Sequence, residues 1–166
     1  NAINLILDPG LAFGTGTHPT THLCLLWLLD NINQNLSVLD YGCGSGILGI
    51  AAKKIGAKKV IGVDIDNQAI KASKDNSEMN NVQISWSNTK EKIDFKADLV
   101  VANILSSALS VLAPILAEHC ITNGKIALSG ILESQEDDIK KIYNSWFDLD
   151  PSYKKDGWVL ISGTKR

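Results

Sequence analysis

Residues 38–46 of this 166-residue chain read VLDYGCGSG. A short apolar, β-type run is followed by glycines at alternate positions, Gly42, Gly44 and Gly46. Glycine is needed where a strand turns sharply into a helix and where a ligand approaches the backbone without a Cβ in the way. An apolar helix expected over 47–55 would present its N-terminal N–H groups to electronegative ligand atoms. The stretch therefore predicts a ligand-binding turn between a strand and a helix.

Short β-rich runs alternate with helical stretches through most of the chain, which is typical of a parallel sheet covered by helices. The end of the chain breaks this alternation, because two β-rich runs are separated only by a turn around Asp156-Gly157. Two successive strands without a helix between them predict an antiparallel pair that closes the sheet. The expected strands are 36–41, 60–63, 82–86, 98–102, 125–128, 147–149 and 158–162, and the expected helices are 18–30, 47–55, 67–79, 107–119 and 133–143.

Two carboxylates stand at the predicted strand ends beside the glycine turn. Asp64 ends the second strand, 22 positions after Gly42, where it can accept hydrogen bonds from ribose hydroxyls. Asp40 lies at the end of the first strand, just before the glycines. An anion there is unfavourable beside a pyrophosphate, but it suits a cationic ligand such as a sulfonium that carries an α-ammonium group.

These residues are compatible with two ligands, a nicotinamide dinucleotide and S-adenosylmethionine. The sequence GSGILG at 44–49 matches the GxGxxG fingerprint of nicotinamide dinucleotide folds, so an NAD-dependent oxidoreductase is the alternative. Asp40 argues against a dinucleotide. In addition, no lysine stands four positions after any of the three tyrosines, so a Tyr-x-x-x-Lys pair is absent. S-adenosylmethionine is therefore the preferred ligand.

From Leu36 to the C-terminus, these features resemble the class I S-adenosylmethionine-dependent methyltransferases. The resemblance implies a Rossmann-like α/β sandwich with a seven-stranded, mostly parallel sheet whose last strand is antiparallel. This implication agrees with the two β-rich runs at the end of the chain.

A second and more specific stretch precedes the sheet, since residues 7–21 read LDPGLAFGTGTHPTT. Small and flexible positions around one aromatic residue describe a loop that can fold over a bound ligand. A simple cap on the following helix, from Thr17 or His18, is the plainer interpretation. Together with NIL at 103–105 and LSGIL at 128–132, the stretch is similar to the ribosomal protein L11 methyltransferase family.

The family resemblance implies methyl transfer from S-adenosylmethionine to lysine side chains and to the N-terminal amine of the ribosomal substrate. It also implies four cofactor contacts, to which we add four residues from the two glycine-rich stretches. The candidate cofactor-binding residues are, from the resemblance, Thr21, Gly42, Asp64 and Asn103 and, from their places in the sequence, Phe13, His18, Asp40 and Gly44.

Asn103 is the catalytic candidate, because it ends the fourth predicted strand beside the expected position of the methyl donor. Its amide can orient the cofactor or accept a hydrogen bond from the target amine, and the alternative is a side chain that only caps the next helix. Ile104 and Leu105 cannot stack a flipped base, so protein or small-amine substrates are preferred over DNA. A partly dry site beside a cation lowers the pKa of a lysine ammonium and favours the reactive amine, so a dedicated base is not required.

The composition argues against several classes of protein. A net charge of −2 and a pI of about 5.9 argue against direct binding of nucleic acid. No apolar run approaches the roughly 20 residues that span a bilayer, and no export signal opens the chain, so we expect a cytoplasmic protein without membrane contact. The three cysteines, Cys24, Cys43 and Cys120, form an odd set without CxxC spacing, so neither a disulfide framework nor a metal site is expected.

The length fits one domain. We expect residues 1–35 to supply a cofactor loop and helix, and residues 36–166 to form the core sheet. The chain opens with Asn1-Ala2-Ile3 rather than an initiator Met, so we interpret it as part of a longer protein. The family resemblance implies an upstream substrate-recognition domain, which is absent from this chain, and a ribosomal protein as the partner.

Overall fold

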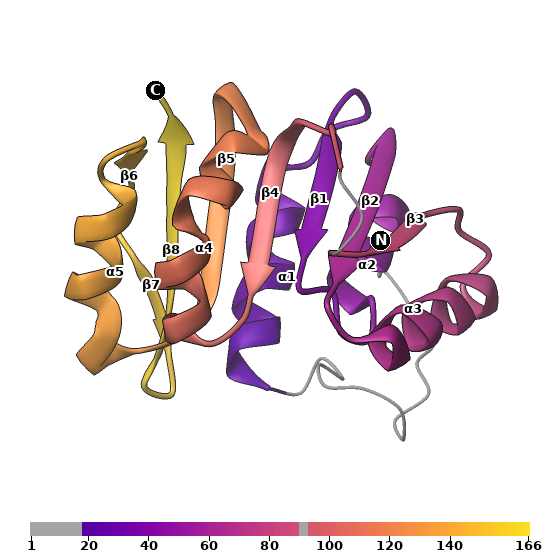
Figure 1. The fold of residues 1–166 in the computed structure, drawn as a ribbon, viewed down its shortest axis with the longest axis horizontal. Coiled ribbons are helices and arrows are strands. Elements are labelled where there is room, and N and C mark those ends of the chain that lie inside the picture. Colours follow the sequence, from indigo (N-terminus) through magenta and orange to yellow (C-terminus); the bar gives the residue numbers. More distant parts are fainter. Residues whose placement is uncertain (1–17, 90–92) are drawn as a thin grey trace.

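The computed structural model describes residues 18–89 and 93–166, which form one mixed sheet with helices on both faces. The sheet follows the order β3-β2-β1-β4-β5-β8-β6, and the short strand β7 pairs with β8 outside this path. The first five strands of this order, from β3 through β2, β1 and β4 to β5, are parallel. Strand β8 runs antiparallel to β5 and β6 (Figure 1). The strands are β1 (Ser37–Tyr41), β2 (Lys59–Asp64), β3 (Ser85–Asn88), β4 (Ala97–Asn103), β5 (Cys120–Leu132), β6 (Phe147–Leu149), β7 (Tyr153–Lys155) and β8 (Trp158–Lys165). The expected α/β fold, with an antiparallel strand closing a parallel sheet, is confirmed.

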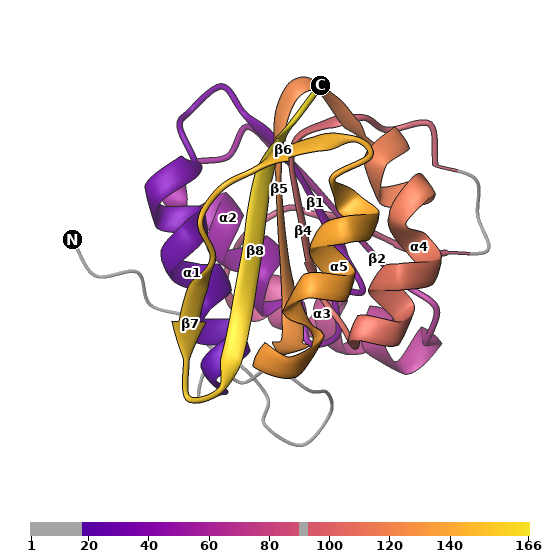
Figure 2. The ribbon, with the colours of Figure 1, turned by 90° about the vertical axis from the view of Figure 1, so that its left-hand side faces the viewer.

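Helices cover both faces of the sheet and enclose a separate core on each. Figure 2 shows the sheet between α1 and α2 on one side and α4 and α5 on the other. Leu109, Leu116 and Tyr143 are fully buried on the α4–α5 side, and Trp27 and Ile47 are buried on the α1–α2 side. The helices are α1 (Pro19–Asn31), α2 (Ile47–Ile55), α3 (Asn67–Met79), α4 (Ser106–Glu118) and α5 (Glu136–Tyr143), and the 3₁₀ turn η1 (Glu133–Gln135) precedes α5.

The third strand begins three residues later than the sequence predicts. The Val82 N–H still donates to the Ser77 carbonyl at 3.1 Å, and Asn81 has a positive φ of 55°. The chain is therefore still bound to the end of α3 at this point, and pairing with β2 starts only at Ser85.

The short strand β7 is an additional element that the sequence analysis did not anticipate. It forms a hairpin with β8 through Asp156 and Gly157, which both have positive φ values. Strand β7 pairs with the first residues of β8, whereas β6 pairs with the last ones. One edge of the sheet is therefore shared by two short strands, and β7 is the strand beyond the expected seven.

Strand β5 is irregular where it passes the end of β4. Its pairing with β8 shifts register between Leu128 and Ile131, and Gly130 has a φ of 88°. A Cβ on Gly130 would lie 2.1 Å from the Ile104 carbonyl oxygen. Glycine is thus required both for the backbone conformation and for the close approach of the segment that follows β4.

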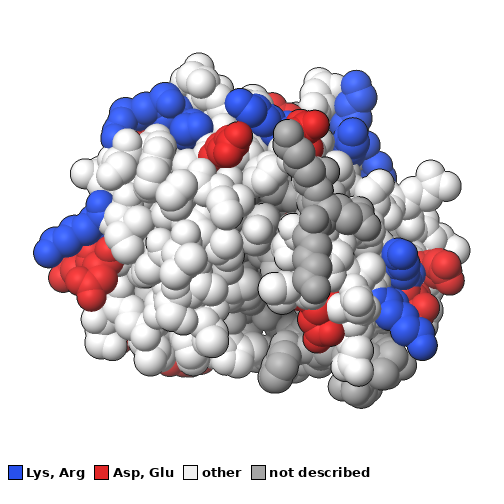
Figure 3. Space-filling model, viewed as in Figure 1, with Lys and Arg blue, Asp and Glu red and all other residues white. Residues whose placement is uncertain are grey.

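The outer surface of α4 is uncharged over most of its length. Val111 is 77% exposed and Ile115 is 42% exposed. Figure 3 shows charged side chains gathered toward the edges of this face rather than at its centre.

Within 18–89 and 93–166, the helices all fall short of the length and apolar character that a membrane crossing requires.

Candidate functional site

A cavity of about 620 Å³ opens at the carboxyl ends of the parallel strands, where α/β folds bind ligands. Its lining follows the strand order, because Asp64 ends β2, Gly42 follows β1, Asn103 ends β4, Gly130 lies in β5 and Trp158 begins β8. The antiparallel direction of β8 brings its first residue to this edge. The described lining consists of His18, Thr20, Thr21, Asp40, Gly42, Cys43, Gly44, Ile47, Leu48, Asp64, Asn103, Ile104, Leu105, Ala108, Gly130 and Trp158.

The glycine turn between β1 and α2 forms the floor of the cavity. The N–H groups of Gly42 and Cys43 both donate to the Val63 carbonyl at 2.8 Å, which ties the turn to β2. Gly42 has a φ of 77°, and a Cβ on it would lie 2.4 Å from the Ile104 side chain. Gly44 also has a positive φ, of 56°. The two candidate glycines therefore stand where backbone conformation or space requires glycine.

Two buried side chains of α3 hold the other side of the turn. The Ser73 hydroxyl donates to the Gly44 carbonyl at 2.9 Å, and the Asn76 amide donates to the Ser45 carbonyl at 2.8 Å. Sequence reasoning missed both residues. The available signal was two polar residues three positions apart on the face of α3 that also carries Ala69 and Ala72. Their bonds occupy carbonyls of the turn and shape it independently of any ligand.

Asp40 is a buried carboxylate beneath the glycine turn. It is 1% exposed, and its Oδ2 accepts the N–H of Gly49 in the first turn of α2 at 2.9 Å. Burial raises the pKa of Asp40 to about 7, the Gly49 hydrogen bond opposes this rise, and the negative charge of Asp64 adds to it. An ionised Asp40 lacks a cationic partner among the described residues that line the cavity. A positively charged ligand would therefore favour its ionised form.

Asp64 lies at the β2 end of the cavity and contacts the turn as well. Its Oδ2 accepts the Gly44 N–H at 2.9 Å, and its Oδ1 accepts the Asp66 N–H at 2.9 Å. Each carboxylate oxygen has a second lone pair, so acceptor capacity remains for ribose hydroxyls. Asp64 can thus shape the turn and bind a ligand at once.

The structure places Asn103 against Thr21, 82 positions earlier in the chain. The Asn103 amide nitrogen lies 3.5 Å from the Thr21 hydroxyl oxygen, at the long limit for a hydrogen bond. If the amide donates to Thr21, its oxygen is left to accept a hydrogen bond from another group. This contact connects α1 to the end of β4 across the cavity.

His18 caps α1 and also lines the cavity. Its Nδ1 accepts the Thr20 N–H at 3.2 Å, and Pro19 occupies the first helical position. The ring meets the Trp158 indole edge to face, with centroids 5.0 Å apart. This geometry favours a cap and a cavity wall over a general base.

Seven of the eight candidate residues line this one cavity, namely His18, Thr21, Asp40, Gly42, Gly44, Asp64 and Asn103. The eighth, Phe13, lies outside the described residues. That the seven bind a cofactor remains a prediction. Sequence reasoning missed Trp158 as a lining residue, and Gly130 was visible only as part of the LSGIL stretch.

The cysteines are uncharged, buried side chains. Burial raises the pKa of all three thiols, so they remain protonated at neutral pH. Within the described ranges, no group of three His, Cys, Asp or Glu side chains has an arrangement that could hold a metal ion.

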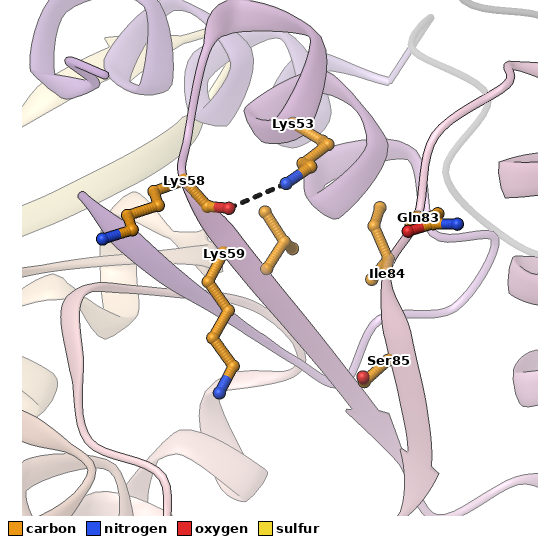
Figure 4. Close-up of a pocket in the computed structure, with 7 residues that line it drawn as sticks. Lys53, Lys58, Lys59, Gln83, Ile84 and Ser85 are labelled. Atoms are coloured by element: carbon orange, nitrogen blue, oxygen red, sulfur yellow. Dashed lines mark hydrogen bonds between the residues drawn. The ribbon is translucent and has the colours of Figure 1, made fainter. Parts of the chain in front are cut away.

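A second cavity, of about 280 Å³, lies at the opposite ends of β2 and β3 (Figure 4). Lys53, Lys58 and Lys59 line it, and the Lys53 ammonium donates to the Lys58 carbonyl at 2.8 Å. Lys53 stands in the last turn of α2, where a cation offsets the negative end of the helix dipole. None of the seven described candidate residues lines this cavity.

The fold agrees with that of solved methyltransferase structures. A methyltransferase crystal structure from Pyrococcus furiosus shares the fold, with a TM-score of 0.77 and 17% identity, and covers 97% of this chain and 89% of that chain. A family model described as ribosomal protein L11 methyltransferase matches residues 1–166. The chain therefore belongs to the ribosomal protein L11 methyltransferase family.

Individual relatives agree with this assignment. A ribosomal protein L11 methyltransferase from Methylobacillus flagellatus is 57% identical over the whole chain, which covers 56% of that relative, and one from Chromobacterium violaceum is 52% identical with the same coverage. The crystal structure of a ribosomal protein L11 methylase from Lactobacillus delbrueckii has a TM-score of 0.87 and 36% identity, with 96% of this chain and 84% of that chain covered. The chain thus spans little more than half the length of the curated relatives it matches.

Membership of this family implies S-adenosylmethionine as the methyl donor, and the residues present fit it. The cavity lies within the size range of cofactor sites. Asp64 offers acceptors for ribose, whereas Asp40 offers negative charge where a pyrophosphate would be repelled. The NAD-dependent alternative is not favoured.

Proposed function

We propose that this chain binds S-adenosylmethionine in the cavity at the carboxyl ends of β2, β1 and β4 and transfers its methyl group to lysine side-chain and N-terminal amines of ribosomal protein L11. The observation that carries the proposal is the pair of carboxylates in a chain of this family. Asp64 and Asp40 lie at one end of the cavity, and Asn103 lies at its centre. The alternative substrate is another protein or a small amine, and the methylation assay distinguishes these from L11.

The role of each residue follows from its position in the cavity. Asp64 holds the ribose through its remaining lone pairs, and the turn at Gly42 and Gly44 lets the ligand lie close to the backbone. Asp40 attracts the cationic part of the ligand from below. Asn103, steadied by Thr21, places its amide oxygen where it accepts an N–H of the target amine.

When bound, the cofactor supplies the methyl group: the amine lone pair forms the new N–C bond while the C–S bond breaks and its electron pair stays on sulfur. The apolar lining, including Ile104, Leu105 and Ala108, lowers the pKa of a lysine ammonium that enters it. The ammonium then loses its proton to water. The chain's main contribution is then the position of the neutral amine rather than proton transfer.

We place this activity in the cytoplasm, where ribosomal proteins are made. We also propose that residues 1–166 form the catalytic part of a protein in which 1–35 supply the cofactor loop and helix and 36–166 the core sheet. Recruitment of L11 would then depend partly on a part of the protein outside these 166 residues. The greater length of the curated relatives supports this proposal.

The test combines binding with a methylation assay. Calorimetric titration should show binding of S-adenosylmethionine and of its demethylated product, and no binding of NAD at similar concentrations. Incubation with L11 and labelled cofactor should place label on lysine or N-terminal amines. Tight NAD binding would overturn the cofactor assignment, and label on other proteins but not on L11 would overturn the substrate assignment.

A further inference from the structure

The backbone of Gly44 in the glycine turn is held on both sides by side chains from other elements. Its N–H donates to the Asp64 carboxylate of β2 at 2.9 Å, and its carbonyl accepts the Ser73 hydroxyl of α3 at 2.9 Å. The next carbonyl, that of Ser45, accepts the Asn76 amide of α3 at 2.8 Å. Because peptide groups are planar, these three bonds fix the orientation of three successive peptide groups.

The two side chains of α3 act on the turn from behind the cavity. Ser73 is 0% exposed and Asn76 is 1% exposed. Neither belongs to the described lining of the cavity, whereas Gly44 and Asp64 do. A ligand in the cavity would therefore contact the turn itself and not the two side chains that hold it.

The Trp86 side chain of β3 fixes α3 against the sheet. Its indole N–H donates to the Ser77 hydroxyl of α3 at 3.1 Å. Its ring fills space left by three glycines, because a Cβ would lie 2.1 Å from the ring at Gly62 and 3.0 Å from it at Gly46 and Gly49. Close packing of this kind leaves little room for α3 to shift. The polar side chains of the helix are therefore in place before a ligand arrives.

We propose that Ser73 and Asn76 are positioning residues for S-adenosylmethionine, and that Ser73 acts through Gly44 on the Asp64 carboxylate. This inference rests on the proposed function. Glycine has the greatest backbone freedom of all residues, so a glycine-rich turn that nothing held would lose conformational entropy when the ligand bound. Side chains that hold the turn beforehand remove this cost from binding.

The chain of hydrogen bonds from Ser73 to Asp64 also orients the carboxylate. The Ser73 bond fixes Gly44, and the Gly44 N–H then occupies one lone pair of Asp64 Oδ2 in a defined direction. The remaining lone pairs of the carboxylate are thereby directed at the position expected for the ribose. Hydrogen bonds in such a chain strengthen one another, so loss of the first weakens the last.

The inference separates cofactor binding from the chemical step. Ser73 and Asn76 lie outside the described lining, so they contact neither the target amine nor the methyl group. Loss of either side chain should raise KM for the cofactor and leave kcat at saturating cofactor within about twofold of the parent. This is the pattern expected when an interaction stabilises the bound ground state and the transition state equally.

Two substitutions and one matched control test the roles of these residues. Ser73→Ala and Asn76→Ala each remove one donor to the turn. Ser110→Ala removes a hydroxyl that donates to the Ser106 carbonyl within α4 at 3.0 Å, outside the described lining. Calorimetry measures the affinity for S-adenosylmethionine and for its demethylated product, and thermal unfolding shows which variants are folded.

The expected result is that Ser73→Ala and Asn76→Ala bind both ligands about fivefold to tenfold more weakly, while Ser110→Ala stays within about twofold of the parent. A purely structural role would lower the unfolding temperature and leave the affinity of the folded protein unchanged. Affinity within twofold of the parent in a folded variant would therefore overturn the role of that residue. A fall in kcat as large as the rise in KM would overturn the assignment to binding.

A double-substitution cycle tests the route through Asp64. In an Asp64→Ala protein, Ser73→Ala should weaken cofactor binding by less than about twofold, because the carboxylate that it orients is gone. Additive losses in the double variant would overturn this route. Asn76→Ala decides the role of α3 if Ser73→Ala fails to fold. Failure of the parent protein to bind S-adenosylmethionine would instead overturn the proposed function.

Discussion

The carboxylate of Asp40 and the backbone N–H of Gly49 are joined by a hydrogen bond of 2.9 Å, which ties the end of β1 to the first turn of α2. The carboxylate is almost wholly buried, and the Gly49 N–H is its one hydrogen-bond donor among the described residues. One hydrogen bond does not offset the loss of water around a full negative charge. The side chain is therefore sensitive to pH and to the charge of whatever fills the cavity.

Replacing Asp40 with Asn should stabilise the cofactor-free protein at pH 8 and change its stability little near pH 4. Burial raises the pKa of Asp40 from 3.8 to about 7, so ionisation is harder in the folded state than in the unfolded one. The resulting loss of stability is absent below pH 4 and grows until the pH passes about 7. Urea unfolding should show a difference on the order of 2–4 kcal/mol at pH 8. Parallel pH profiles for the two proteins would contradict the assignment.

Replacing Asp64 with Ala should weaken binding of S-adenosylmethionine by roughly 2–4 kcal/mol, because two charge-assisted hydrogen bonds to ribose are lost and water replaces them in part. Asp64→Asn should recover part of the affinity, since it keeps one acceptor oxygen. Calorimetry measures both changes. Thermal unfolding without cofactor then measures the separate loss of the Gly44 and Asp66 contacts. Affinity within twofold of the parent in Asp64→Ala would rule out the ribose contact.

Thr21 and Asn103 should behave as one unit. Thr21→Val removes the hydroxyl that lies 3.5 Å from the Asn103 amide, and Asn103→Ala removes the amide. Each single substitution should lower kcat/KM for methylation, and the double variant should be less impaired than the sum predicts, with a coupling of about 0.5–1.5 kcal/mol. Additive losses would show that the two side chains act independently.

Gly130→Ala should be much more damaging than Gly157→Ala, although both glycines have similar positive φ values of 88° and 84°. A Cβ at Gly157 has no atom within 4 Å, so only the backbone conformation is strained, at a cost of roughly 1 kcal/mol. At Gly130 the Cβ also collides with the Ile104 carbonyl, and the cost should rise to about 3 kcal/mol or more. Urea unfolding of the two variants measures the difference. Equal losses would mean that the segment after β4 moves aside without strain.

A protein extended to the length of the curated relatives should methylate intact L11 far faster than this 166-residue chain, because contacts remote from the reacting amine also position it. Its affinity for S-adenosylmethionine should be the same, since the candidate contacts lie within the chain. A short lysine peptide should show a smaller difference between the two proteins. Equal rates on intact L11 would place substrate recognition within these 166 residues.

The element order could be read from the sequence because it depends on local patterns. The apolar run and alternate glycines at 38–46 predicted β1, the turn and α2, and the bounds of α2 and α3 agree with the expected ranges. Local patterns also placed Asp64 and Asn103 at strand ends, and the carboxyl ends of parallel strands meet at one edge. The candidate site could therefore be assembled before its geometry was known.

Contacts between segments far apart in the sequence could not be predicted from local patterns. The start of β3 depends on hydrogen bonds to the end of α3, and the pairing of Asn103 with Thr21 depends on how α1 packs on the sheet. Trp158 carries no local signal of function. It reaches the cavity because β8 runs antiparallel to β5, which brings its first residue to the edge where the parallel strands end. Strand direction and register are set by packing across the whole sheet, and no short stretch of the sequence contains that information.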